Sequence, residues 1–176
     1  MMQLLISVTS LEEAQIALEN GADFIDLKDP SQGALGALPL ETITEIVSYV
    51  HAAGISNRKL TSATIGDLPM QPQLIAAHVE RLAVTGVDMI KIGFFDDGEN
   101  KPDAYEQCLS ALQSLASNGL KLVAVLFAEH EYPCNLISHI KNAGFYGVML
   151  DTATKNGATF FDYFTKTFWF KNRFFT

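Results

Sequence analysis

Three lysines stand at or just beyond the end of an apolar run, and they are spread evenly along the chain. Lys28 ends FIDLK, Lys91 lies within MIKIG, and Lys155 closes VMLDTATK. Their separation is about twice the length of one strand–helix unit, so an alternating chain would place them at the ends of its second, fourth and sixth strands. In a closed parallel barrel these strand ends share the face that carries the chemistry. Amines that converge there suggest Schiff-base chemistry on phosphorylated carbonyl compounds.

Asp26 and Lys28 are two residues apart in a predicted strand, so their side chains point to the same face. A lysine attacks a carbonyl group only as the free amine, and the ordinary lysine pKa of about 10.4 leaves little free amine at neutral pH. A second ammonium nearby disfavours the charged form, and Lys91 is placed to provide it. The alternatives are a structural ion pair at Asp26 and Lys28, and a Lys91 whose head reaches solvent.

Further polar groups follow other predicted strands. Asp151 ends the sixth strand and could orient or neutralise the amines, while Lys155 lies in the next loop, where a plain exposed lysine is the alternative. Thr64 ends the third strand, and its small hydroxyl suits a barrel interior. Gly33 and Gly36 lie in the loop SQGALGA, whose backbone amides could approach a phosphate, although an ordinary turn explains the two glycines equally well.

Composition excludes several classes of partner. The net charge of −8 argues against nucleic acid and anionic membranes. No apolar run has the length of a membrane span, and MMQLLISVTS lacks the cationic start of a signal peptide, so we expect a cytoplasmic protein. The four histidines lack ligand spacing, and neither a metal nor a cofactor is expected. Cys108 and Cys134 have no metal or redox spacing and are predicted to be buried in helices.

Six short apolar runs, each followed by an amphipathic stretch that ends near a glycine, predict six strand–helix units. The strands are expected at 3–8, 23–28, 59–65, 88–93, 120–126 and 146–150, and the helices at 10–20, 39–53, 72–85, 103–117 and 134–142. Strands without polar alternation belong to a parallel sheet that helices cover. The fold class predicted is α/β, a TIM-type (β/α) barrel that is incomplete, with about six of eight units.

One domain is expected over 1–176, with the six units in 1–159 and an atypical aromatic tail in 160–176. The tail, FFDYFTKTFWFKNRFFT, holds most of the chain's 12 Phe and its single Trp. We expect a truncation or an altered reading frame here; the alternative is a complete short domain whose tail covers an open sheet edge. Six strands would leave two exposed edges, which favour association, so a homo-oligomer is expected.

Five motifs, taken together and in this order, resemble the (5-formylfuran-3-yl)methyl phosphate synthase family of methanofuran biosynthesis, also called 4-(hydroxymethyl)-2-furancarboxaldehyde phosphate synthase. They are DLKDP at 26–30, GALGA at 33–37, SATIGD at 62–67, IKIG at 90–93 and MLDTA at 149–153 with Lys155. The resemblance runs from residue 3 to about residue 164. It implies a TIM barrel and a lyase that needs no cofactor.

The resemblance also implies a substrate and roles. The family condenses two molecules of glyceraldehyde 3-phosphate, a triose phosphate, with loss of phosphate and water. By motif, Lys28 would form the Schiff base and Lys91 would accept a proton, while Asp26, Asp151 and Lys155 would complete the catalytic set. Family members continue beyond this match into strands seven and eight, whose loops are a common phosphate site. Another class I aldolase acting on phosphorylated sugars, or a non-catalytic barrel fragment, is therefore the alternative.

Overall fold

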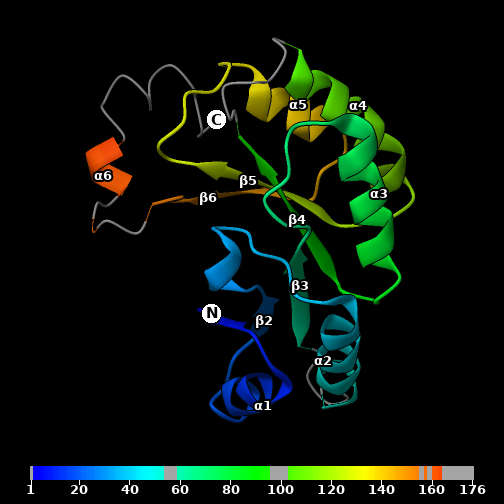
Figure 1. Ribbon diagram of the computed structural model, residues 1–176, viewed down its shortest axis with the longest axis vertical. Helices are drawn as coiled ribbons and strands as arrows, with labels where there is room; N and C mark the ends of the chain where they lie inside the picture. The colour runs from blue at the N-terminus through cyan, green and yellow to red at the C-terminus, as the bar shows by residue number, and fades with distance from the viewer. Residues whose placement is uncertain (1, 54–58, 96–102, 155–156, 158–159, 164–176) are drawn as a thin grey trace.

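The computed structural model describes residues 2–53, 59–95, 103–154, 157 and 160–163. Its six strands are parallel and form one sheet in the order β1-β2-β3-β4-β5-β6. They are β1 (Leu5–Val8), β2 (Phe24–Leu27), β3 (Leu60–Thr64), β4 (Met89–Phe94), β5 (Leu122–Phe127) and β6 (Gly147–Asp151). The sheet curves into an open half-barrel with β1 and β6 at its edges (Figure 1). The six predicted strands and their order are confirmed.

Helices connect the strands and lie along the outer side of the curve (Figure 1). They are α1 (Leu11–Glu19), α2 (Leu40–Ala53), α3 (Pro72–Ala83), α4 (Ala104–Ser117) and α5 (Leu136–Asn142). Two short helices lie apart from these (Figure 1), η1 (Pro30–Gln32) after β2 and α6 (Phe160–Tyr163) after β6. The hydroxyl of Ser10 caps α1 by accepting the amide of Glu13 at 3.2 Å, as the sequence predicts. The single-turn η1 lies in the loop between β2 and α2, which is part of the candidate site.

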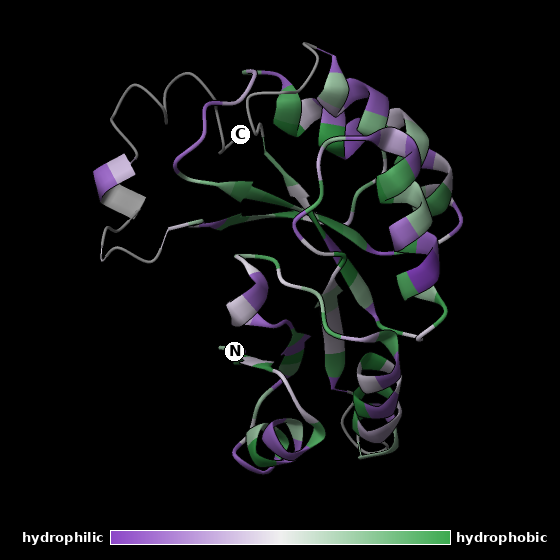
Figure 2. Cartoon of the chain, in the orientation of Figure 1, coloured by the Kyte–Doolittle hydropathy of each residue, from purple (hydrophilic) through white to green (hydrophobic). Residues whose placement is uncertain are grey.

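The two faces of the sheet differ in what they contact. Alternate strand residues such as Ile25, Ile92 and Leu126 join the helices in the main apolar core. The residues between them face the concave side, where Val125 and Phe127 form a separate small cluster with Leu35. Figure 2 shows apolar strands bordered by helices that are polar on their outer sides. The main core therefore lies between the sheet and the helices, and the concave face lies outside this core.

The prediction for Cys134 is wrong, and the predictions for Lys155 and the aromatic tail stay predictions. Cys134 was expected in a buried helix, but it is exposed and precedes α5, because that helix begins only at Leu136, after Pro133 and Asn135. Lys155 and most of the aromatic tail lie outside the described residues, so the structure adds nothing about them. In the described part of the chain, each helix falls short of the length and apolar character needed to cross a bilayer.

The two cysteines predict a sharp contrast in reactivity. Cys108 is fully buried in α4, and burial raises the pKa of its thiol to about 12. Only the thiolate reacts with alkylating reagents, so iodoacetamide at neutral pH should modify Cys134 in the folded protein and reach Cys108 only after denaturation. Peptide mass mapping with and without denaturant measures this. Equal rates at the two positions in the folded protein would contradict the burial of Cys108.

Candidate active site

Asp26 lies at the centre of the polar groups on the concave face. Its side chain is 1% exposed, and it accepts hydrogen bonds from the hydroxyls of Ser7 at 3.0 Å and Ser62 at 2.6 Å. Lys91 Nζ lies 2.5 Å from Asp26 Oδ1. The partners come from β1, β3 and β4, so three strands besides its own converge on this carboxylate. Each donor replaces part of the hydration that the Asp26 carboxylate loses when it is buried.

The ion pair of Asp26 and Lys91 is almost completely removed from solvent. Lys91 is 3% exposed although it is the one lysine inside a six-residue buried strand. A buried charge needs a partner, and Asp26 satisfies that need. The carboxylate also offsets the charge of Lys91, so the field that Lys91 exerts on its surroundings is weaker than an isolated ammonium would give. Of the two possible roles, this arrangement suits proton transfer better than supply of a bare positive charge.

Lys28 follows β2 and continues its ladder, since its amide donates to the carbonyl of Val8 at 3.3 Å. Leu27 pairs with Ala63 and Thr64 pairs with Lys91, so continuing the register puts Lys28 opposite Thr64. Lys28 and Lys91 are then two strands apart in one row, about 10 Å between Cα atoms. Lys28 is half-buried, and its amine makes neither a salt bridge nor a hydrogen bond within the described residues.

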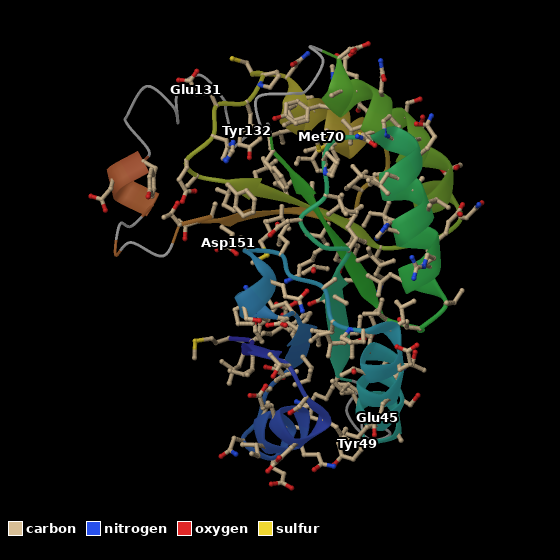
Figure 3. The ribbon with its side chains drawn as sticks, in the orientation of Figure 1. Glu45, Tyr49, Met70, Glu131, Tyr132 and Asp151 are labelled. Carbon is tan, nitrogen blue, oxygen red and sulfur yellow. The ribbon has the colours of Figure 1, made fainter. Side chains whose placement is uncertain are left out.

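Asp151 lies at the carboxyl end of β6, opposite Phe127 in the sheet (Figure 3). Its Oδ1 accepts the amide of Thr152 at 2.8 Å, and the side chain is half-buried. Lys91 pairs with Val123, which lies four residues before Phe127, so Asp151 is nearer the strand ends than the buried pair. The structure thus joins Asp26 to Lys91 directly and places Asp151 two side-chain layers closer to the mouth.

The loop between β2 and α2 is tightly held by its own contacts. Gly33 has φ +108° and ψ −178°, a conformation that glycine alone adopts readily, and an added Cβ would lie 1.9 Å from Asp67 Oδ2. A Cβ on Gly36 would lie 2.0 Å from the carbonyl oxygen of Asp29. The Thr64 hydroxyl donates to the carbonyl of Leu35 at 2.6 Å. Local packing therefore accounts for both glycines, and a phosphate role for this loop stays a prediction.

Several residues of the site were not predicted from the sequence. Ser7 is the one polar residue inside an apolar strand, which is the signal that could have identified it. Asp67 accepts the Leu35 amide at 3.3 Å, and Glu129 accepts the amides of Ala153 at 3.1 Å and Thr154 at 2.9 Å. These contacts join loops far apart in sequence, so no local pattern indicates them.

Glu129 ties the loop after β5 to the loop after β6. Partial burial tends to raise the pKa of Glu129, but hydrogen bonds from the amides of Thr154, Ala153 and Glu129 itself, together with nearby His130, outweigh it and hold the pKa below the ordinary 4.5. Its own loop is anchored by Tyr132, whose hydroxyl accepts the amide of Phe127 at 2.8 Å (Figure 3). Burial raises the pKa of Tyr132, so this phenol stays protonated.

Replacing Glu129 with Gln should loosen the loop after β6, since a carboxamide keeps one acceptor oxygen for two amides. Hydrogen exchange at Ala153 and Thr154 should become faster, while Glu131→Gln, a change at an exposed position in the same loop, should leave both amides unchanged. In the unmodified chain both amide proton shifts should move as pH falls through the lowered pKa of Glu129, with a midpoint below 4.5. A midpoint above 4.5 would contradict the hydrogen bonds from Ala153 and Thr154 to Glu129.

Among the described residues, no group of three or more His, Cys, Asp or Glu side chains is placed to hold a metal ion. His130 contacts the rings of Phe95, Phe127 and Tyr132 at centroid distances of 6.4, 6.0 and 6.3 Å. It belongs to an aromatic cluster near the ends of β4 and β5.

Sequence comparison finds one family and its members. The family model described as 4-HFC-P synthase matches residues 4–169. A (5-formylfuran-3-yl)methyl phosphate synthase of Archaeoglobus fulgidus is 34% identical over 92% of this chain and 70% of its own length. The same synthase of Methanocaldococcus jannaschii is 33% identical over 94% and 71%. A Methylorubrum extorquens protein named for this activity is 41% identical over 89% of this chain, which spans only 60% of that relative.

Structural comparison bears on the fold alone. A Burkholderia cenocepacia J2315 protein described as a phosphonomutase superimposes with a TM-score of 0.61 at 13% identity, covering 84% of this chain and 68% of that protein. A 2,3-dimethylmalate lyase of the PEP mutase/isocitrate lyase superfamily gives 0.57 at 18% identity, covering 85% and 58%. At these identities the matches show a shared arrangement of strands and helices and say nothing about the reaction.

Proposed function

Because the chain belongs to the 4-HFC-P synthase family, we propose that it makes (5-formylfuran-3-yl)methyl phosphate from two molecules of glyceraldehyde 3-phosphate through a Schiff base on Lys28. The chain spans 60% of one relative's length and 70% of another's, so the activity of those proteins is carried to it here as a proposal. In this proposal the protein is a lyase of methanofuran biosynthesis, a TIM-type barrel enzyme working in the cytoplasm.

Each residue has a stated task. The half-buried amine of Lys28 attacks the aldehyde of one triose phosphate, and loss of water gives the imine. Lys91 passes its own proton to Asp26 and then, as the free amine, takes up the proton released next to that imine, so the pair acts as a proton relay. Asp151 lies nearer the strand ends, where it can orient the second substrate, and Lys155 completes the set. Gly33, Gly36 and Thr64 border the substrate.

One observation carries the proposal more than any other. Lys91 and Asp26 form a buried pair on the concave face, and the strand register puts Lys28 in the row of Lys91 with an amine that lacks a partner among the described residues. Imine chemistry needs one accessible, unpaired lysine that attacks the carbonyl group and a second, paired and buried lysine that transfers protons. An ion pair of Asp26 with Lys28, the structural alternative, would have left Lys28 unavailable.

The direct test is turnover with defined substrates. The purified chain is incubated with glyceraldehyde 3-phosphate, and both inorganic phosphate and the furan aldehyde, identified by mass and absorbance, are measured. We expect phosphate and furan in equal amounts. Cleavage or condensation of other sugar phosphates without furan would favour another class I aldolase. No turnover by a folded chain, where a full-length relative is active, would identify a non-catalytic fragment.

We also propose that the chain forms a homo-oligomer. Both edges of the sheet carry exposed apolar side chains, with Leu5 44% exposed on β1 and Val148 38% exposed on β6. Unpaired parallel edges of this kind favour association with another copy. Light scattering coupled to gel filtration measures the mass, and a single species at 19.3 kDa over a wide concentration range would contradict the proposal.

A further inference from the structure

Leu35 is the loop residue that enters the concave face. It belongs to the loop between β2 and α2, which is partly exposed at Gly33, yet Leu35 itself is 1% exposed. Its side chain packs with Val125 and Phe127 of β5 and with Ala34, Phe95 and Met149 around them. A loop leucine that follows β2 would not be expected to contact β5, three strands away, so its burial there requires an explanation.

The position of Leu35 relative to Lys91 follows from β4. Gly93 lies two residues after Lys91, on the same face and one side-chain layer closer to the strand ends. A Cβ on Gly93 would lie 2.6 Å from Leu35 Cδ1 and 2.7 Å from Phe95 Cε1, so the leucine, together with Phe95, occupies the space that a side chain at position 93 would fill. Leu35 therefore lies directly above Lys91, between the buried pair and the mouth.

Three contacts hold the leucine there. The carbonyl of Leu35 accepts the Thr64 hydroxyl at 2.6 Å, and its amide donates to Asp67 at 3.3 Å. Gly33 is closely packed against the same Asp67 carboxylate. Thr64 is the last residue of β3 and Asp67 follows that strand, so the end of β3 fixes the loop. Asp67 is an exposed residue whose bonds to the loop are long, which makes this attachment one that a substrate can displace.

We propose that Leu35 is a specificity-determining residue that covers Lys91, so that only a carbonyl compound able to displace the loop 33–37 reaches this amine. The inference rests on the proposed function, because it assigns Lys91 a place beside the substrate. Leu35 excludes bulk water from the pair, and Gly93 leaves room for it, because a Cβ at this position would collide with Leu35 and with Phe95. The compound admitted is small and aldehydic, and its phosphate stays on the mouth side of Leu35.

Accessibility of Lys91 tests this without any turnover. The folded chain is treated with formaldehyde and cyanoborohydride, and methylation of each lysine is followed by peptide mass mapping. In the unmodified protein Lys28 should react much faster than Lys91. In Leu35→Ala the rate at Lys91 should rise about tenfold or more, because the amine no longer waits for a local opening, while the rate at Lys28 should change little.

Leu38→Ala is the matched control. Leu38 is a buried leucine of the same loop, but it packs in the main core rather than above Lys91. If Leu38→Ala exposes Lys91 as much as Leu35→Ala does, the opening is global and the proposal is wrong. Leu35→Val is a smaller truncation, to be used if Leu35→Ala folds poorly. Its methylation rate at Lys91 should lie between the rate in the unmodified protein and the rate expected for Leu35→Ala. An unchanged rate at Lys91 in both Leu35 variants would also overturn it.

Discussion

Replacing Lys91 with Met should destabilise the fold by about 3–5 kcal/mol, the usual effect of leaving a buried charge without its partner. The salt bridge is buried on both sides, with side chains 4% and 1% exposed, so Asp26 would keep only the hydroxyls of Ser7 and Ser62. These two neutral donors cannot replace an ammonium 2.5 Å away. Urea denaturation followed by circular dichroism measures the free energy of unfolding.

Two further variants separate charge from packing. Asp26→Asn combined with Lys91→Met removes both charges but keeps an acceptor for the serines, so the double variant should be more stable than Lys91→Met alone. Lys59→Met is the matched control, since Lys59 pairs with Asp23 at 3.2 Å with side chains 18% and 32% exposed, and a much smaller loss is expected. Equal losses of unfolding free energy for Lys91→Met and Lys59→Met would mean that the buried pair matters no more to stability than a partly exposed pair.

Replacing Lys28 with Arg should reduce formation of the furan product to the background rate. Arginine keeps the positive charge and most of the length of lysine, but its guanidinium does not form an imine under these conditions. If the charge of Lys28 only binds phosphate, Lys28→Arg should keep its function. A variant that still binds inorganic phosphate but no longer turns over therefore identifies a covalent role for Lys28. Steady-state kinetics and a separate binding measurement with inorganic phosphate give the two quantities.

Lys121→Arg serves as the control for this variant. Lys121 precedes β5, at the opposite end of the sheet from the candidate site, and its amine lies 5.4 Å from the ring centroid of Tyr146. Its replacement should leave turnover unchanged. If Lys28→Arg kept more than a small fraction of the activity of Lys121→Arg, Lys28 would not be the residue that forms the Schiff base.

The strands could be predicted because each is a short apolar run between turn residues, and β4 with its six buried positions is the clearest. The end of a helix is harder to place, and Cys134 shows why: Pro133 and Asn135 delay α5, so an apolar residue before it stays exposed. Local patterns determine strands, whereas helix starts depend on caps that several residues can provide.

For the candidate site, the sequence indicates residue types that can do chemistry but not the contacts between them. Asp26 and Lys28 are neighbours in sequence and suggested a pair, yet the register of β2, β3 and β4 gives Asp26 to Lys91 instead. Leu35 and Glu129 act through loops that only the fold brings together. A sequence shows which side chains can do chemistry, but their partners depend on strand register and loop packing, which are tertiary properties.

The central claim is that Lys28 forms the covalent intermediate, and trapping of that intermediate tests it most directly. The folded chain is mixed with glyceraldehyde 3-phosphate, reduced with borohydride, digested and mapped by mass spectrometry. The account predicts one triose phosphate adduct, on the peptide that contains Lys28, and none on the buried Lys91. An adduct on Lys91 instead, or no adduct at all on a chain shown to be folded, would contradict it.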